Sequence, residues 1–410
     1  MEEYKIIEHI GDGAHGHVLK GCDLKFNTTV ALKRIYLKKS KNEIPISVLR
    51  EIKILLTVES EYVMELIDYF SHDCSVVLVF EFMPSGLWEI LHDVNNPPSI
   101  PHIKTYMRML LKGVTYLHEN GIMHRDLKPA NLLISDKGIL KIGDLGLSRM
   151  LWPSEDEGRP YTHQVATRWY RAPELLYGSR HYDQSVDLWA VGCIFAEMIN
   201  KTPLFPGEND IEQLAMVLNN LGMPTNQSWP GLKELPDYNK ISFRPSKGKP
   251  FEKLIPDTDS ACIDLIKSFL CYDGRKRLEA KKVTLTATLV APGSSTSAGL
   301  TAALFTAEAH RSYSLTGYAL QYDSLKSNQR NVSDYSNKRN LTSTYTNIQP
   351  SNKTAQIYYN LNYRRVNISM KSWFLIDGPC CPRSFEEAQN EKGFGKTIEK
   401  VLQKLFQGYI

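Results

Sequence analysis

The stretch His124-Arg125-Asp126-Leu127-Lys128-Pro129-Ala130-Asn131 decides the fold and the chemistry expected of this 410-residue chain. Thirteen residues after Asn131 comes Asp144-Leu145-Gly146. Phosphoryl transfer requires an oriented hydroxyl, metal-neutralised phosphates and in-line geometry from a protein. We therefore expect Asp126 to accept the proton of a substrate hydroxyl, and Asn131 and Asp144 to hold Mg²⁺. The alternative, three common polar residues in an ordinary loop, leaves the second motif at this distance unexplained.

A glycine-rich segment near the N-terminus supplies a candidate phosphate loop. Gly11-Asp12-Gly13-Ala14-His15-Gly16-His17-Val18 lies between two stretches whose alternation predicts strands. Glycines there let backbone N–H groups approach phosphate oxygens without a Cβ in the way. The motif alone is weak, since plain hairpins share it, and a dinucleotide site needs a helix after the loop. Here a strand follows and ends in Val30-Ala31-Leu32-Lys33, and Glu51 on the next predicted helix can hold Lys33 in place.

Hydrophobic periodicity divides the first 283 residues into a strand-rich part and a helical part. Strands are predicted over residues 4–10, 17–22, 28–36 and 75–83. Helices are predicted after Pro45, between Pro101 and Asn120, and over 186–199, 211–219 and 260–270. A hinge is expected over 82–86, so the predicted fold class is α+β, with a small β-rich lobe (4–82) and a larger helical lobe (87–283).

The composition changes after residue 283. Residues 284–370 are rich in Ser, Thr, Asn and Tyr and lack long apolar periodicity, which predicts disorder. Residues 284–410 carry 14 Lys and Arg against 8 Asp and Glu, so the basic excess of the chain lies there. A short helix is predicted over 384–407 with one apolar face and one lysine-rich face. That helix could dock on a partner or a membrane surface, or lie on its own domain.

Features of the whole chain argue against several classes of protein. The formal net charge is +4, which does not argue for nucleic-acid binding. The seven cysteines show neither zinc-site nor disulfide spacing and fit a reducing compartment. There is no apolar leader and no run of about 18 apolar residues, so neither secretion nor a membrane span is expected.

In these motifs the chain resembles eukaryotic Ser/Thr protein kinases of the cyclin-dependent type, from about Tyr4 to Lys282. The segment Tyr161-Thr162-His163-Gln164-Val165-Ala166-Thr167-Arg168-Trp169-Tyr170-Arg171-Ala172-Pro173-Glu174 is similar to the cell-cycle-related branch of that family, as are residues 205–207, 209–214 and 235–243. The resemblance implies a bilobal kinase domain over residues 4–283, followed by a divergent tail over 284–410.

The resemblance implies a nucleotide site built from both lobes. Glu81 and Met83 would bind adenine through their backbones, beside the gatekeeper Phe80. Lys33, held by Glu51, would pair with the α- and β-phosphates. The residues that would enclose ATP are Ile10, Gly11, Asp12, Gly13, Ala14, His15, Gly16, His17, Val18, Ala31 and Leu133.

The resemblance also implies a catalytic set in which Asp126, Lys128 and Asn131 act together with Thr167. Lys128 would contact the γ-phosphate, as is usual in kinases of Ser and Thr. An internal apolar spine would consist of Leu55, Leu66, His124 and Leu145, although plain core packing explains those four residues equally well.

Control of activity is expected to depend on charge. A phosphate on Thr162 would bring roughly two negative charges into the activation segment and could order it by pairing with arginines. The expected pocket consists of Arg50, Arg125 and Arg149; the alternative is three independent surface arginines. Arg171 resembles the arginine that shapes a proline-accepting pocket, so the substrate motif is predicted to be Ser/Thr-Pro.

The chain departs from the family in several places. Leu145 replaces the usual Phe, and Ala14-His15 replaces a Thr-Tyr pair used for inhibitory phosphorylation, so that brake is absent. Residues 45–51 match the cyclin-contact helix only loosely, which leaves the need for a cyclin or cyclin-like activator open. Arg277 is expected to pair with Glu174. The last helix of the family is expected to be missing, which would lower stability unless the tail replaces it.

The sequence thus predicts an ATP- and Mg²⁺-dependent kinase of Ser/Thr-Pro sites in proteins. The resemblance implies cell-cycle or ciliary control, with activation segments of related kinases among the substrates, and a location in the cytoplasm, nucleus or cilium. Two alternatives stay open. A pseudokinase scaffold would act by binding alone if loss of the last helix abolished activity. A small-molecule kinase would not need residues 169–174 or a long phosphorylatable segment before them.

Overall fold

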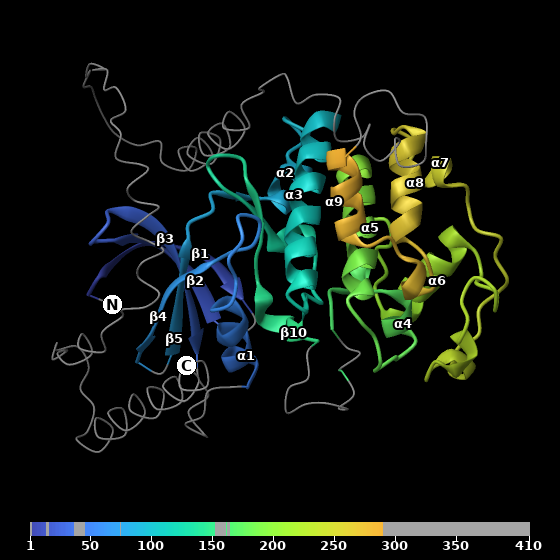
Figure 1. Ribbon diagram of the computed structural model, residues 1–410, viewed down its shortest axis with the longest axis horizontal. Helices are drawn as coiled ribbons and strands as arrows, with labels where there is room; N and C mark the ends of the chain where they lie inside the picture. The colour runs from blue at the N-terminus through green and yellow to red at the C-terminus, as the bar shows by residue number, and fades with distance from the viewer. Residues whose placement is uncertain are drawn as a thin grey trace, which may run out of the picture. The chain divides into compact units, whose positions relative to one another are not determined.

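A five-stranded antiparallel sheet forms the first lobe. The computed structural model describes residues 2–13, 16–36, 46–73, 75–151, 161 and 165–289. Across the sheet the strands follow the order β1 (Tyr4–Gly13), β2 (Gly16–Asp23), β3 (Thr28–Tyr36), β5 (Ser75–Glu81) and β4 (Leu66–His72). Helix α1 (Ile46–Leu55) lies beside this sheet (Figure 1).

The two faces of the sheet bury different side chains. On one face Leu19, Leu32 and Val79 stand opposite one another in register and belong to a small separate core. On the other face Val18, Lys33 and Leu78 share a register line, and Leu78 joins the main core together with Ile52 of α1. Strand alternation therefore turns Lys33 toward α1 and the second lobe.

Short strands and helices make up the second lobe. The strands are β6 (Ser85–Gly86), β7 (Ile122–Met123), β8 (Leu132–Ile134), β9 (Leu140–Ile142) and β10 (Arg149–Met150). The helices are α2 (Leu87–His92), α3 (Ile100–Glu119), α4 (Pro173–Leu176), α5 (Ser185–Asn200), α6 (Asp210–Leu221), α7 (Phe251–Leu254), α8 (Ser260–Phe269) and α9 (Ala280–Leu289). Helices α9, α3, α5 and α8 lie side by side (Figure 1).

Helix α5 is the centre of this lobe. Every residue from Val186 to Ile199 is buried, as the apolar character on all its sides predicts. The expected strands and helices are thus present with ends shifted by a few residues. The β-rich first lobe and the helical second lobe confirm the predicted α+β class.

Several findings differ from the expectations, since the short strands β6 to β10 and the helices α2, α4 and α7 are not predicted either. Strand β4 is not predicted, because none of its residues is fully buried and the apolar alternation is lost. The expected loss of the last helix is corrected: α9 runs from Ala280 to Leu289, so the boundary placed at residue 283 falls inside it. Ala280 and Val283 are each 1% exposed, and Lys281 Nζ lies 2.6 Å from Glu119 Oε1 of α3.

Several expectations concern residues beyond this description. The tail after residue 289, with the helix predicted over 384–407, lies outside the described residues. So do Ala14, His15 and Thr162. Within the described ranges, no helix combines the length and apolarity that a membrane crossing requires.

Candidate active site

One lysine from the sheet joins two carboxylates from other elements. Lys33 Nζ on β3 donates to Glu51 Oε1 of α1 at 2.7 Å and to Asp144 Oδ1 at 3.0 Å. Burial alone would lower the pKa of Lys33, but the two carboxylates raise it above its ordinary value. Burial alone would likewise raise the pKa of Asp144, but Lys33 holds it below its ordinary value. Lys33 and Asp144 are therefore both charged at neutral pH, and the predicted bond between Lys33 and Glu51 is formed.

The catalytic loop is fixed from behind by Asp187 in the first turn of α5. Its carboxylate accepts the backbone N–H groups of His124 at 2.9 Å and Arg125 at 2.8 Å. His118 Nε2 lies 2.9 Å from the same carboxylate. Arg125 has a φ of 67°, a left-handed conformation that two anchored N–H groups can maintain. Asp187 thus sets the backbone from which Asp126 projects.

Asp126 is surrounded by the other predicted catalytic residues. Its Oδ2 accepts Lys128 Nζ at 2.8 Å and Asn131 Nδ2 at 3.2 Å. Its Oδ1 accepts the backbone N–H of Thr167 at 2.7 Å and the Thr167 hydroxyl at 3.0 Å. Lys128 Nζ also lies 2.9 Å from Thr167 Oγ1. The structure therefore gathers all four residues of the predicted set around one carboxylate.

The candidate magnesium ligands fit that ion by their chemistry. Asn131 Nδ2 donates a hydrogen bond to the Asp126 backbone oxygen at 2.8 Å. The side-chain amide oxygen of Asn131 can therefore ligate a cation. Asp144 adds a carboxylate, and oxygen ligands of this kind suit Mg²⁺. No group of three or more His, Cys, Asp and Glu side chains among the described residues is arranged to hold a metal. A Mg²⁺ ion that arrives with a nucleotide needs only one or two protein ligands.

The predicted phosphate loop is a tight hairpin where it is described. A Cβ on Gly16 would collide with the carbonyl group of Arg34 on β3, so this position requires glycine. A Cβ on Gly11 would meet nothing within 4 Å, which leaves space beside the backbone for a ligand. Asp12 and His17 stand opposite each other between β1 and β2. Ile10 is 42% exposed, as expected of a side chain at a cleft entrance.

The hinge side of the cleft comes from β5, β6 and β8. Phe80 pairs with Ala31 of β3, and Leu133 of β8 pairs with Gly86 of β6. The Glu81 carboxylate accepts a hydrogen bond from Lys141 at 2.6 Å. We therefore expect Glu81 to contact adenine through its backbone rather than its side chain. These positions fit the expected adenine site. Met83 lies two residues after the end of β5 and is half-buried.

The expected spine is part of the main core. Leu55, His124 and Leu145 are at most 2% exposed, and Leu66 packs against the core while half-buried. His124 Nε2 lies 2.9 Å from the carbonyl oxygen of Gly143, next to Asp144. Leu145 therefore fills the place of the usual Phe without leaving the position exposed.

Two of the three arginines that were predicted to be regulatory lie around a pair of tyrosines. Arg125 donates to the Tyr182 hydroxyl at 3.0 Å, and the Arg149 guanidinium lies 5.4 Å from the Tyr161 ring centroid. The rings of Tyr161 and Tyr182 are 5.1 Å apart. Arg50 lies beside Glu51 on α1. The sequence interpretation missed Tyr182, for which no local motif gives a signal.

On the substrate side, Arg171 fixes a strained backbone. Arg171 Nε donates to the Val165 carbonyl at 2.9 Å and Nη2 donates to the Ala166 carbonyl at 3.0 Å. Ala166 has a φ of 66°. Asp210 of α6 accepts both Arg171 Nη1 and Arg168 Nε at 2.9 Å. Asp210 was not predicted, because it lies about forty residues from the arginines that it holds.

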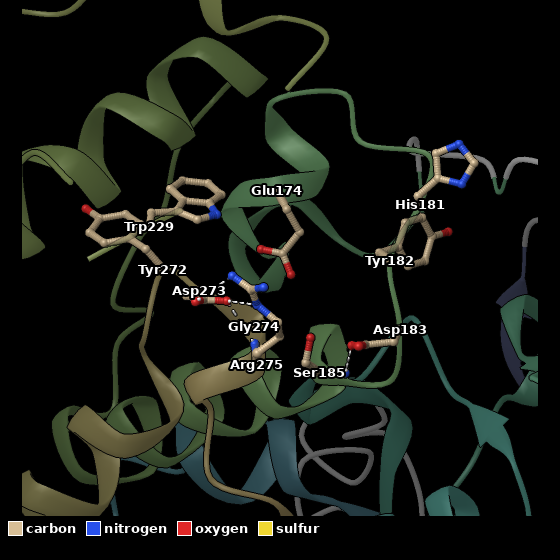
Figure 2. A pocket seen from close by; sticks show the side chains of 10 residues that line it. All are labelled: Glu174, His181, Tyr182, Asp183, Ser185, Trp229, Tyr272, Asp273, Gly274 and Arg275. Atoms are coloured by element: carbon tan, nitrogen blue, oxygen red, sulfur yellow. Dashed lines mark hydrogen bonds and ion pairs between the residues drawn. The ribbon is translucent and has the colours of Figure 1, made fainter. Parts of the chain in front are cut away.

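The predicted ion pair between Arg277 and Glu174 in the second lobe is also formed. Arg277 binds Glu174 through two bonds, of 2.6 and 2.7 Å. Beside it lies a cavity of about 300 Å³, with Tyr182 on one wall and Trp229 and Tyr272 on the other (Figure 2). Its lining includes none of the predicted catalytic residues. Tyr182 connects this cavity to Arg125 of the catalytic loop.

Known proteins share this arrangement. Residues 4–287 match the family model described as protein kinase domain. Cyclin-dependent kinase 20 of Danio rerio is 53% identical over 286 residues, which cover 70% of this chain and 83% of that protein. Cyclin-dependent kinase D-1 of Arabidopsis thaliana is 40% identical over 281 residues, or 68% and 69% of the two chains.

A solved structure agrees. One chain in the crystal structure of the yeast RNA Pol II CTD kinase CTDK-1 complex is similar with a TM-score of 0.63 and 34% identity. The match covers 68% of this chain and 90% of that chain. The predicted resemblance is thereby confirmed, and the chain belongs to the protein kinase family and, within it, to the cyclin-dependent Ser/Thr protein kinases.

Proposed function

We propose that this Ser/Thr kinase is proline-directed and transfers the γ-phosphoryl group of ATP to Ser or Thr residues that precede proline. The observation that carries the proposal is the pair of bonds from Arg171 to the Val165 and Ala166 carbonyls. These carbonyls are already bound, so they offer little to an N–H group of the residue after the acceptor. Proline has no backbone N–H, so it loses nothing at such a surface.

The charged groups of the cleft support a role for ATP and Mg²⁺. When bound, ATP supplies the phosphoryl group and Mg²⁺ neutralises its charge. Lys33 would hold phosphate oxygens, and Asn131 and Asp144 would ligate the ion. Asp126 would accept the proton of the substrate hydroxyl, while Lys128, now bound to Asp126 and Thr167, would reach the γ-phosphate.

A peptide comparison tests the choice of proline. Peptides that differ only in Pro or Ala after the acceptor Ser should differ in kcat/KM by about tenfold or more, in favour of Pro. Arg171→Lys should reduce that ratio, because a lysine cannot bind two carbonyls in a fork. Equal rates for the two peptides with the wild-type protein would refute proline direction while leaving kinase activity intact.

The biological setting is also a proposal. The name of the zebrafish relative supports activation by a cyclin or cyclin-like partner, and the family supports protein substrates. We propose roles in the cell cycle or cilia, in the cytoplasm and nucleus, with activation segments of related kinases among the substrates. Activity with and without a panel of purified cyclins would test the partner.

The scaffold alternative loses its main support. It depended on a missing last helix, whereas α9 is formed and buries Ala280 and Val283. Lys33 donates to both Glu51 and Asp144, so these three residues are assembled rather than displaced. We therefore favour catalysis over binding alone.

A further inference from the structure

A groove on the second lobe lies apart from the catalytic residues. The cavity of about 300 Å³ shown in Figure 2 adjoins a second hollow of about 440 Å³. Both are lined by Glu174, Trp229 and Asp273, and together they form the Trp229 groove. Its first hollow extends to Tyr182 and its second to Glu234. These volumes are at the lower end of those that hold ligands, so the groove has room for one or two side chains of a bound protein.

Aromatic side chains form one wall of the Trp229 groove. Trp229 and Tyr272 stack with ring centroids 5.5 Å apart and planes 18° from parallel. Tyr177 packs edge-on against Trp229, with ring centroids 5.8 Å apart. The faces of such rings attract cations. Because the arginine guanidinium is flat and stacks on aromatic faces, it is the cationic side chain that suits this wall best.

The neighbouring Arg277 shows how this part of the protein holds a guanidinium. It donates to Glu174 through bonds of 2.6 and 2.7 Å, so the two charges cancel. The Arg277 guanidinium also lies 5.2 Å from the ring centroid of Trp189. A carboxylate and an aromatic face therefore act together on one buried arginine.

The remaining charges of the Trp229 groove are negative in excess. Asp273 accepts Arg275 Nε at 2.9 Å and Nη2 at 3.1 Å, so this pair is neutral. Asp183 and Glu234 are exposed, and within the part of the chain that the structure describes neither carboxylate is bound to a basic side chain. The Asp183 carboxylate turns toward the inside of the first hollow (Figure 2). The groove thus combines unneutralised carboxylates with the Trp229 wall, on an open surface.

An anion is the competing ligand, because Arg275 and His181 also line the groove. However, two nitrogens of Arg275 already donate to Asp273. His181 points away from the other lining side chains (Figure 2). An anion would also lie near the carboxylates of Asp183 and Glu234, which would repel it. The charges therefore favour a cation.

We propose that the Trp229 groove docks an arginine-containing segment of the protein substrate, away from the acceptor Ser or Thr. The inference rests on the proposed function and adds a second point of substrate recognition to it. One guanidinium would stack on Trp229 and bond to Asp183, and a second basic side chain would meet Glu234. Docking of this kind raises the local concentration of the acceptor and leaves the chemical step unchanged.

The place of the groove supports a substrate as the partner. Tyr182 lines the groove and accepts Arg125 Nη1 of the catalytic loop at 3.0 Å. Glu174 lies three residues after Arg171, the residue expected at the proline-accepting surface. The groove is therefore built on the same two segments as the substrate side of the active site.

Phosphorylation of a matched peptide series by the full chain tests the docking. Each peptide carries one Ser-Pro acceptor and, at the end of a Gly-Ser spacer, either two arginines or two citrullines, which resemble arginine in shape but lack its charge. Spacers of several lengths are placed before or after the acceptor. At the length that spans active site and groove, we expect kcat/KM to be about tenfold higher for the arginine peptide, mainly through KM. Added salt should reduce this ratio.

Two substitutions in the groove should remove the preference. Asp183→Asn keeps the side-chain oxygen that accepts the Ser185 N–H at 2.9 Å, so the turn before α5 is retained while the charge is lost. Glu234→Gln removes the charge of an exposed side chain. The double variant should give equal kcat/KM for the arginine and citrulline peptides. Asp257→Asn, at an exposed carboxylate of the same lobe outside the groove, is the matched control and should keep the wild-type ratio.

Equal kcat/KM for the arginine and citrulline peptides at every spacer length would overturn the inference, as would a ratio that the double variant retains. An equal loss in Asp257→Asn would also overturn it, because the preference would then reflect the charge of the whole lobe. Phosphoserines in place of the arginines should give no gain, and a gain would show an anion site instead. Failure of the wild type to phosphorylate any peptide of the series would refute the proposed function, and this inference with it.

Discussion

At the scale of the residue, the catalytic loop depends on a buried carboxylate that takes no part in the chemistry. Asp187 is 1% exposed and receives N–H groups from His124 and Arg125. Burial alone would raise the pKa of Asp187. The hydrogen bond from His118, the nearby His118 and His124 side chains and the backbone N–H of Arg125 together hold this pKa below its ordinary value. The carboxylate is therefore needed in its charged form.

Asp187→Asn should both weaken the fold and reduce activity. An amide can accept on one side only, so one buried N–H group would lose its partner, at a cost of about 2–4 kcal/mol in the free energy of unfolding. The pKa of Asp187 is lower in the folded protein than in the unfolded chain. Its charged form therefore stabilises the fold above about pH 4, and this stabilisation is lost as the pH falls through the pKa of the folded protein. Urea unfolding at pH 7 and pH 3 measures this: the difference between variant and wild type should shrink at the lower pH. A constant difference would contradict the assignment.

At the scale of the element, helix α9 shows what periodicity can predict. β3 and α3 could be predicted because their apolar residues repeat every two and every three to four positions, and such repeats are local. The presence of α9 was missed because the sequence after residue 283 ceases to follow the family, although Ala280 and Val283 already share a helix face. Contacts such as Arg125–Tyr182 and Arg171–Asp210 could not be predicted, since they join residues distant in sequence and carry no motif. Lys33, Asp126 and Asp144 could, because each lies within a short motif.

Val283→Asp should destabilise the second lobe by about 3 kcal/mol, because it places an unpaired charge where the native side chain is 1% exposed. Lys281→Ala on the same helix is the control. Its partner is Glu119, both side chains are about half exposed, and the urea midpoint should hardly change. Equal effects of the two changes would mean that α9 does not pack on α3 as described.

At the scale of the whole molecule, two kinds of bridge hold the site together. Lys33 and Asp144 connect the sheet of the first lobe to the loop after β9 in the second lobe. Within the second lobe, Arg277 links α4 to the segment before α9 and also donates to the carbonyl groups of Cys271 and Ser185. The catalytic loop, substrate surface and last helix are therefore parts of one bonded framework.

Arg277→Ala should cost about 3–5 kcal/mol, since it leaves the Glu174 carboxylate buried without its partner. Lys276→Ala, one residue earlier, removes an exposed side chain that donates to the Gln227 carbonyl oxygen at 3.2 Å, and it should leave the unfolding midpoint almost unchanged. Thermal unfolding of both variants gives the comparison. A small effect of Arg277→Ala would show that the bidentate pair is not a structural support.

The most direct measurement of the central claim is Mg²⁺-ATP-dependent phosphorylation of a Ser-Pro protein substrate by the wild-type chain and by Asp126→Asn. Asp126 accepts bonds from Lys128, Asn131 and Thr167, so the variant keeps the shape but removes the charged acceptor. We predict transfer to Ser by the wild type and a loss of at least about a hundredfold in kcat for the variant. Transfer that is equal in the two proteins would contradict the account.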